Sequence, residues 1–314
     1  MSGKQTPTVP ADAAGIARAV EVLRAGGLVA IPTETVYGLA ARADSEAAVA
    51  RIFEAKGRPG FNPLIVHVTG VEQAAALAEM SPETRHYASQ HWPGPVTLVL
   101  PRRADAALAP AVTAGLDTVA VRVPRHLVAQ AVLAGLGVPL AAPSANRSGF
   151  VSPTTAAHVL ETLDGRIDLV LDGGPSDAGI ESTILKLRAD GRWEQLRPGP
   201  EDTANWHDSH FVQGAPLPGE AIEAPGQLAS HYSPGKPVRL AALVAAEDEF
   251  LIGFGVVEGD VTLSAGADLA EAARRLYACL HQAALSRLPR IAIAPVPEQG
   301  LGIAINDRLR RAAA

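Results

Sequence analysis

Basic side chains and hydroxyl groups, which together can hold phosphate, recur in the loops of this chain. The segment KGRPGFNPL places Lys56, Arg58 and Asn62 within seven residues, where an expected helix runs into a loop. An arginine fork beside an ammonium group suits a polyphosphate. The helix dipole also favours basic residues at the C-terminus of any helix. The alternative is therefore that these residues mark a helix end and bind no ligand. We favour phosphate binding, because Lys56 is one of only four lysines.

A second group of candidates surrounds Arg122. In the segment VAVRVP this arginine stands among small apolar residues, and Thr118 lies four positions earlier on the same strand face. A buried arginine needs either a protein carboxylate or an anionic ligand as its partner, and both remain open. The loop AAPSANRSGFVSP then supplies Ser144, Asn146 and Ser152, whose polar groups can wrap phosphate oxygens; a plain serine-rich turn is the alternative.

Three more segments each carry a weaker signal. PTETVYGL, residues 32–39, offers Thr35 directly after an expected strand, although an ordinary capped turn has the same composition. DGGPSDAGIESTI supplies Ser182 where a strand begins, and LRPGP supplies Arg197 where one ends. The carboxyl ends of strands are where open α/β sheets bind ligands, so we expect these side chains to gather.

His67 is a candidate for a metal ligand or a catalytic residue. In the strand-like segment LIVHV, period-two alternation places it opposite Leu64, Val66 and Val68. A lone histidine in a strand is more often structural than catalytic, and no second histidine stands at ligand spacing. The sequence also lacks a GxxxxGK motif. We therefore expect no metal site made by the protein, and nucleotide binding through an atypical phosphate cradle.

The elements that position these loops alternate between strands and helices, which indicates an α/β sheet covered by helices. Expected helices span residues 11–24, 45–56, 82–90, 125–134 and 155–163. Expected strands span residues 28–32, 64–68, 96–100, 118–123, 138–142, 168–171, 183–187 and 193–197.

The chain divides into two domains joined by a linker. We assign residues 1–210 to the site-bearing domain and the segment 211–237, rich in proline, glycine and alanine, to the linker. Residues 238–314 form a second, small β/α set, with strands expected at 238–243, 250–256 and 291–295 and helices at 269–287 and 303–311. Nothing in this second set looks catalytic.

Composition excludes several classes of protein. Of 314 residues, 47% are hydrophobic, and the single cysteine, Cys279, rules out an internal disulfide framework and a cysteine-rich zinc site. The net charge of −6 argues against a broad nucleic-acid surface. No stretch is long and apolar enough to span a membrane. We expect a cytoplasmic protein without a membrane partner.

Taken together, the segments PTETVYGL, KGRPGFNPL, WPGPVTLVL, GLDTVAVRVP, PSAN and GIESTI closely resemble the YrdC family, the L-threonylcarbamoyladenylate synthases. SHYSPGKPVRL and the ending GLGIAINDRLRRAA resemble its longer, two-domain form. The resemblance implies a YrdC-like twisted mixed sheet with helices, plus a small C-terminal β/α domain of Rossmann-like type. It also implies synthesis of threonylcarbamoyl-AMP from L-threonine, bicarbonate or carbon dioxide, and ATP. Pyrophosphate is released, and the product serves tRNA threonylcarbamoyladenosine modification.

The same resemblance assigns roles to individual residues. Around L-threonine it implies Thr35, His67, Arg122, Ala142 and Ser182. Around ATP it implies Arg58, Asn62, Thr118, Ser144, Asn146, Ser152, Arg197 and Tyr232. Lys56 and Arg58 are expected to stabilise charge on the phosphates, and magnesium to accompany ATP. A downstream transfer machinery is the expected partner, with only indirect contact to tRNA. Because Tyr232 lies in the linker, we also hypothesise that the linker is a lid, which cutting near Pro218 would disable.

Two other functions stay open. The same loops suit a related ATP-using enzyme with a different acceptor for the carbamoyl or acyl group. A module that binds structured RNA is the alternative from another class, although the acidic net charge and the sparse aromatic residues argue against it.

Overall fold

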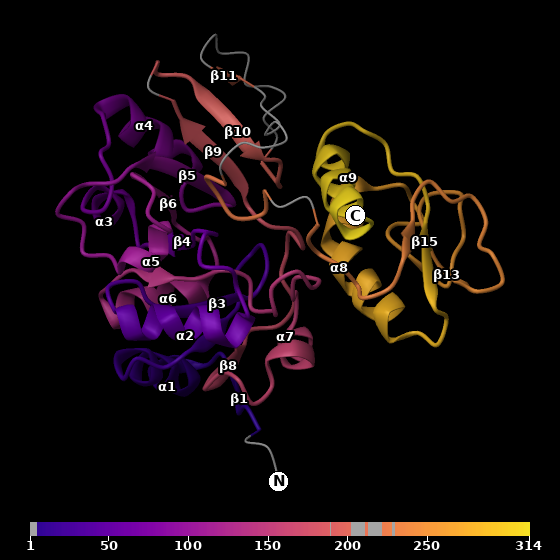
Figure 1. The fold of residues 1–314 in the computed structure, drawn as a ribbon, viewed down its shortest axis with the longest axis horizontal. Coiled ribbons are helices and arrows are strands. Elements are labelled where there is room, and N and C mark those ends of the chain that lie inside the picture. The colour runs from indigo at the N-terminus through magenta and orange to yellow at the C-terminus, as the bar shows by residue number, and fades with distance from the viewer. Residues whose placement is uncertain (1–4, 189, 202–210, 213–221, 228–229) are drawn as a thin grey trace.

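The computed structural model describes residues 5–188, 190–201, 211–212, 222–227 and 230–314, with the backbone alone at 211–212. In this part of the chain, one large mixed sheet of eleven strands and one small sheet of four make up two lobes (Figure 1). In sheet order, the large sheet contains β1 (Thr8–Pro10), β8 (Leu169–Asp172), β2 (Val29–Ile31), β3 (Gly38–Arg42), β7 (Leu140–Ala141), β4 (Ile65–His67), β6 (Thr118–Arg122), β5 (Val96–Pro101), β9 (Thr183–Leu187), β10 (Trp193–Arg197) and β11 (Phe211–Val212).

Helices cover the large sheet on both faces. The helices of this lobe are α1 (Ala13–Arg24), α2 (Glu46–Lys56), α3 (Val71–Ala75), α4 (Pro82–His91), α5 (Pro110–Thr113), α6 (Leu127–Leu136) and α7 (Ala156–Leu163). Helices α1 and α6 pack together over β2, β3, β7 and β8, where they bury residues such as Leu23 and Leu133. Helices α2 to α5 and α7 enclose the larger core on the other face, with Ile52 and Val159 at its centre.

Over one part of the sheet, the described residues contribute no helix to the apolar packing, and this shapes the site. On the face of β4, β6, β5 and β9 turned away from the larger core, Ile65, Val99, Ala120 and Ile184 form a small apolar cluster. The residue that closes the cluster is Ala224, from the linker. The linker therefore takes the place that α1 and α6 occupy over the other half of the sheet.

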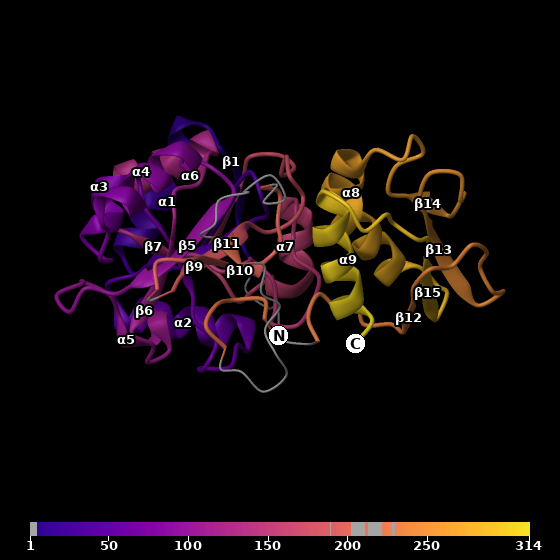
Figure 2. The same cartoon turned by 90° about the horizontal axis from the view of Figure 1, so that it is seen from above.

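The small lobe has a parallel sheet with two helices. Its strands, in sheet order, are β12 (Val238–Arg239), β15 (Arg290–Ile293), β13 (Glu249–Gly253) and β14 (Val261–Thr262), all paired in parallel. Helices α8 (Leu269–Leu285) and α9 (Leu301–Ala312) lie between this sheet and the large lobe (Figures 1 and 2). Side chains on both helices consequently reach the large lobe.

The fold class agrees with the sequence prediction, while some element boundaries were wrong. Strand β3 was expected as part of a loop, because GLAAR contains none of the β-branched or aromatic residues that typify strands. The helix expected at 125–134 is α6, which starts at Leu127 after His126 caps its N-terminus. Strand β1 and the short helices α3 and α5 were also missed. Among the described residues, no helix has the length and apolar character needed to cross a membrane.

Candidate active site

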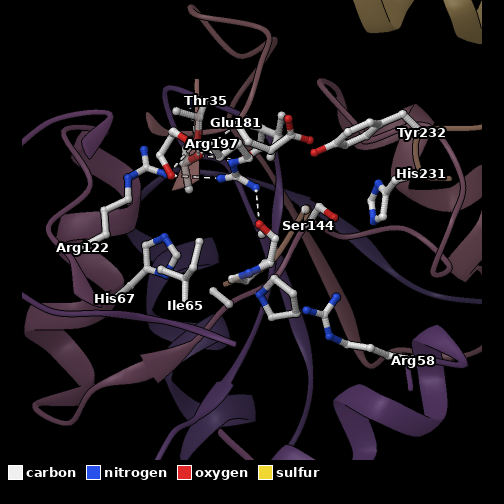
Figure 3. Close-up of a pocket in the computed structure, with 18 residues that line it drawn as sticks. Thr35, Arg58, Ile65, His67, Arg122, Ser144, Glu181, Arg197, His231 and Tyr232 are labelled. Carbon is white, nitrogen blue, oxygen red and sulfur yellow. Dashed lines mark hydrogen bonds between the residues drawn. The ribbon is translucent and has the colours of Figure 1, made fainter. Parts of the chain in front are cut away.

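A pocket opens where β4, β6, β7, β9 and β10 meet the linker (Figure 3). Nine of the residues predicted from sequence line it: Thr35, Arg58, His67, Arg122, Ala142, Ser144, Ser182, Arg197 and Tyr232. The prediction that these separate loops gather at one place is therefore confirmed, whereas the contact of each residue with a particular ligand stays a prediction.

The end of α2 brings the first arginine to the pocket. Ser45 caps the helix N-terminus, and the helix ends at Gly57, whose left-handed φ of 59° turns the chain sharply. Arg58 then donates hydrogen bonds to the side-chain oxygen of Asn62 at 2.7 Å and to the carbonyl of Pro63 at 2.8 Å. Burial, with the neighbouring Arg197, lowers the pKa of Arg58 to about 10, so it stays cationic at neutral pH.

Strand pairing brings Arg122 and His67 side by side. The two residues are direct partners in the parallel register of β6 and β4. Arg122 donates to the Glu34 carboxylate at 2.6 Å, to the Thr35 hydroxyl at 2.8 Å and to the Gly94 carbonyl at 3.2 Å. Of the two partners left open for Arg122, the structure shows a protein carboxylate, and binding of an anionic ligand stays a prediction.

The ion pair between Arg122 and Glu34 is almost fully enclosed, with side-chain exposures of 4% and 2%. Burial by itself raises the pKa of Glu34, but the charge of Arg122 and the hydrogen bonds that the carboxylate accepts together outweigh burial, so the net pKa lies below the ordinary value. Glu34 is thus ionised at neutral pH. Three of the five N–H groups of Arg122 donate to described residues. The other two have no hydrogen-bond partner among the described residues, and Arg122 lines the pocket.

His67 is neutral in this environment. Burial, followed by the charge of Arg122, lowers its pKa to about 3. Its Nδ1 atom is buried and has no hydrogen-bond partner among the described residues. The ring lies on the face predicted from the alternation, because Leu64, Val66 and Val68 belong to the core on the opposite face.

Arg197 occupies the middle of the pocket, between Ser182 and the linker. It donates to the Ser182 carbonyl at 3.1 Å, to the Ser182 hydroxyl at 3.2 Å and to the Pro225 carbonyl at 3.3 Å. Tyr232 and the preceding His231 also line the pocket from the linker, and Tyr232 adopts a left-handed φ of 63°. The lid hypothesis remains a prediction, since Pro218 lies outside the described residues.

Lys56 and Asn146 lie behind the pocket and do not line it. The Lys56 ammonium donates to the backbone carbonyls of Ser144, at 2.5 Å, and of Asn146. The Asn146 amide donates to the carbonyls of Arg147 and Phe150 at 3.0 and 2.8 Å. The described bonds of Lys56 hold the loop that carries Ser144, and its action on phosphate charge stays a prediction.

Three other predicted residues are also absent from the pocket lining. Asn62 orients Arg58, and Ser152 donates to the Glu181 carboxylate at 2.6 Å. Thr118 stands at the first position of β6, four residues and therefore about 13 Å from Arg122 along the strand. The prediction put Thr118 on the correct strand face but overlooked that spacing, and nothing described here places it at the cavity.

Among the lining residues that sequence reasoning missed, two are titratable: Glu181 and His231. Burial lowers the pKa of His231 to about 3 and keeps it neutral. Glu181 forms bonds to Ser152, and to Tyr277 and Arg308 of the small lobe. Glu181 stands inside the motif GIESTI, so its position in sequence was a usable signal. Its partners Tyr277 and Arg308 lie 96 and 127 positions away, so the sequence near Glu181 gave no signal for these contacts.

The fold also brings together three side chains able to bind a metal, which the sequence separates. Ligand atoms of His158, Glu161 and His281 lie within 4.8 Å of one another, outside the pocket. However, His281 pairs with Glu161 through Nδ1 at 2.6 Å and with the Ser152 carbonyl through Nε2 at 3.2 Å. The two histidine rings stack at 3.9 Å with only 10° between their planes, so their nitrogen lone pairs lie in two separate, nearly parallel planes. The group works as a contact between α7 and α8.

The chain matches two protein-family models. Residues 21–199 match the family described as Telomere recombination, and residues 193–314 match the family described as Threonylcarbamoyl-AMP synthase, C-terminal domain. The threonylcarbamoyl-AMP synthase of Bacillus subtilis is 41% identical over 95% of this chain and 92% of its own length. The threonylcarbamoyl-AMP synthase of Pyrococcus abyssi is 39% identical over 92% of this chain and 91% of its own. A crystal structure of P. abyssi Sua5 complexed with L-threonine matches with a TM-score of 0.87 at 36% identity, covering 98% of this chain and 97% of that one.

Proposed function

This chain belongs to the threonylcarbamoyl-AMP synthase family, and from that premise we propose that it makes threonylcarbamoyl-AMP from L-threonine, bicarbonate or carbon dioxide, and ATP. The reaction is an adenylyl transfer that releases pyrophosphate. The product supplies a separate system that modifies tRNA, so contact of this chain with tRNA is indirect.

One observation carries the proposal: a single pocket combines two kinds of cationic site. Arg58 and Arg197 have no carboxylate partner among their described hydrogen bonds, which suits the several negative charges of a triphosphate. Arg122 is already paired with Glu34, which suits a zwitterion such as an amino acid. Figure 3 displays Arg58 and Arg122 on opposite sides of the cavity.

The proposed chemistry relies on placement more than on proton transfer. The free amine of threonine captures carbon dioxide and loses a proton, and a carbamate oxygen then attacks the α-phosphorus of ATP as pyrophosphate leaves. Arg122 and Thr35 hold the carboxylate end of threonine, and Ser182 lies between them and Arg197. Orienting both reactants in one pocket and stabilising phosphate charge with Arg197 supply the acceleration.

The residues that line the pocket limit how magnesium can take part. Among the described lining residues, the one carboxylate is Glu181, and Ser152, Tyr277 and Arg308 already donate to it. We therefore propose that magnesium enters as the complex with ATP and is held chiefly by phosphate oxygens, where it neutralises the leaving pyrophosphate.

A single incubation tests the proposal. Purified protein is mixed with magnesium-ATP and bicarbonate, with and without L-threonine, and nucleotides and pyrophosphate are followed by chromatography. We expect pyrophosphate release that depends on threonine, together with a labile adenylate containing threonine. A matched reaction with serine or carbamoyl phosphate in place of threonine tests the different-acceptor alternative.

Two results would overturn this function. Pyrophosphate release with serine but not threonine would assign the chain to an enzyme with another acceptor. No product with any acceptor, combined with a salt-dependent shift of tRNA mobility in the absence of ATP, would favour the RNA-binding alternative.

A further inference from the structure

The small lobe places one arginine deep beneath the candidate active site. Arg308, on α9, has a side-chain exposure of 0%. It donates to the Glu181 carboxylate at 3.2 Å, to the Pro198 carbonyl at 2.6 Å and to the Asp307 carboxylate at 3.0 Å. Burying a guanidinium so completely costs free energy, unless hydrogen bonds and opposite charges compensate for the lost hydration. Two of these partners, Glu181 and Pro198, belong to the segments that carry the pocket.

Glu181 is the pocket residue that Arg308 controls. One of its oxygens accepts from Ser152 at 2.6 Å, and the other accepts from Tyr277 at 2.8 Å and from Arg308. Tyr277 and Arg308 both come from the small lobe, on α8 and α9. Burial alone raises the pKa of Glu181, but the charges of Arg308 and Arg197 and the hydrogen bonds from Ser152 and Tyr277 together outweigh burial and lower the pKa to about 2. Glu181 is therefore a fixed negative charge at the pocket wall.

A negative charge at this wall would work against an anionic ligand. Glu181 precedes Ser182, and Arg197 donates to both the carbonyl and the hydroxyl of Ser182. Without a counter-charge, Glu181 would repel phosphate and draw Arg197 toward itself, because opposite charges in a buried site interact strongly. Arg308 does not line the cavity, and its ion pair with Glu181 offers that counter-charge.

We propose that Arg308 is a positioning residue for the nucleotide: it neutralises and anchors Glu181, so that Arg197 stays available to phosphate. This gives the small lobe a specific task in the large lobe's chemistry, and it rests on the proposed function. Arg308 acts through Glu181 and touches no substrate.

The experiment compares ATP and L-threonine binding by calorimetry in the full chain and in three variants. In Arg308→Met the Glu181 charge is left unpaired, and we expect the ATP dissociation constant to rise about tenfold or more, with that for L-threonine within about threefold of wild type. Arg308→Lys keeps the charge but loses the planar guanidinium that donates to several partners at once. We therefore expect the ATP dissociation constant to lie between those of wild type and Arg308→Met. In Glu181→Gln/Arg308→Met both charges are gone, and ATP affinity should return to within about threefold of wild type.

The matched control is Arg310→Met on the same helix, where Arg310 forms an exposed pair with Glu298. This variant should bind both ligands as wild type does. Circular dichroism and thermal unfolding establish that each variant is folded. If Arg308→Met fails to fold, the double variant and Arg308→Lys still decide the question.

Two results would overturn the inference. One is a folded Arg308→Met protein that binds ATP within about twofold of wild type. The other is a folded double variant that binds ATP as poorly as Arg308→Met, or about tenfold more weakly than wild type where the single variant does not fold. Binding is measured without turnover, so the proposed function fails separately: wild type would then bind ATP and show the Arg308 effect while releasing no threonine-dependent pyrophosphate.

Discussion

At the scale of single residues, Arg122 already forms a buried ion pair with Glu34 of the same chain. A carboxylate ligand must therefore be held by the two remaining N–H groups of a planar fork, and lysine cannot reproduce that geometry. We expect Arg122→Lys to raise the KM for L-threonine about tenfold or more while the KM for ATP changes less than about threefold. Steady-state pyrophosphate release, with each substrate varied in turn, measures both constants.

The control for this substitution is Arg42→Lys, because Arg42 pairs with Asp44 at the partly exposed end of β3. It should leave both constants unchanged. An equal rise in both KM values for Arg122→Lys would contradict a role confined to the amino acid.

His67 makes folding stability depend on pH, in a direction that its pKa fixes. The folded pKa of about 3, lowered by burial and by Arg122, lies below the ordinary value of 6.5. Above pH 6.5 the histidine is neutral in both states. As the pH falls from 6.5 toward 3, the unfolded chain binds a proton that the folded chain does not, so stability decreases by about 1.4 kcal/mol per pH unit.

We expect wild type to lose about 2 kcal/mol more stability than His67→Asn between pH 6.5 and pH 5. Urea unfolding at the two pH values gives the difference. His86→Asn, a change at an exposed position, should behave as wild type does. Equal losses for wild type and His67→Asn would show that His67 accepts its proton in the folded chain as readily as in the unfolded one.

At the scale of elements, Lys56 ties the end of α2 to the loop after β7. Burial, followed by the charge of Arg58, lowers its pKa well below the ordinary value. Lys56→Met leaves the carbonyls of Ser144 and Asn146 without this donor. We expect a loss of about 2 kcal/mol in unfolding free energy, and a KM for ATP about fivefold higher because Ser144 lines the pocket.

Urea unfolding and ATP titration test this, and Lys236→Met is the matched control. Lys236, near the end of the linker, likewise donates to two backbone carbonyls, but these belong to Ala283 and Ser286 of the small lobe. It should lower stability without raising the KM for ATP. If Lys56→Met weakened ATP binding about a hundredfold with unchanged stability, the ammonium would act on the phosphates, as the sequence had predicted.

The same scale explains what sequence reasoning could and could not predict. Loops that follow strands, such as the one holding Thr35, were placed correctly because strand ends converge at one part of a sheet. Strand β3 was not predicted, because tertiary packing on both faces overrides the weak strand propensity of GLAAR. The role of Glu181 escaped for a different reason: its partners lie in another lobe, and no local pattern encodes a contact between positions 181 and 308.

At the scale of the whole molecule, the two lobes share one apolar cluster. Val36, Val151 and Ile180 of the large lobe pack in the same buried cluster as Leu276 and Ile305 of the small lobe. Together with the buried pair between Arg308 and Glu181, this cluster means that neither lobe can unfold without exposing apolar surface and charge on the other. Cooperative unfolding of the whole chain should result.

Tryptophan fluorescence makes this cooperativity measurable in a Trp206→Phe background, because the two remaining tryptophans, Trp92 and Trp193, lie in the large lobe. Ile293→Ala opens a cavity at a fully buried position in β15 of the small lobe and should cost about 3 kcal/mol. If the lobes unfold together, the urea midpoint from tryptophan fluorescence must fall as far as the midpoint from circular dichroism. A fluorescence midpoint that stays at the wild-type value would mean that the lobes unfold independently. The small lobe could then unfold while the pocket stays folded. In that case the ion pair between Arg308 and Glu181 would not be needed to hold the pocket in place.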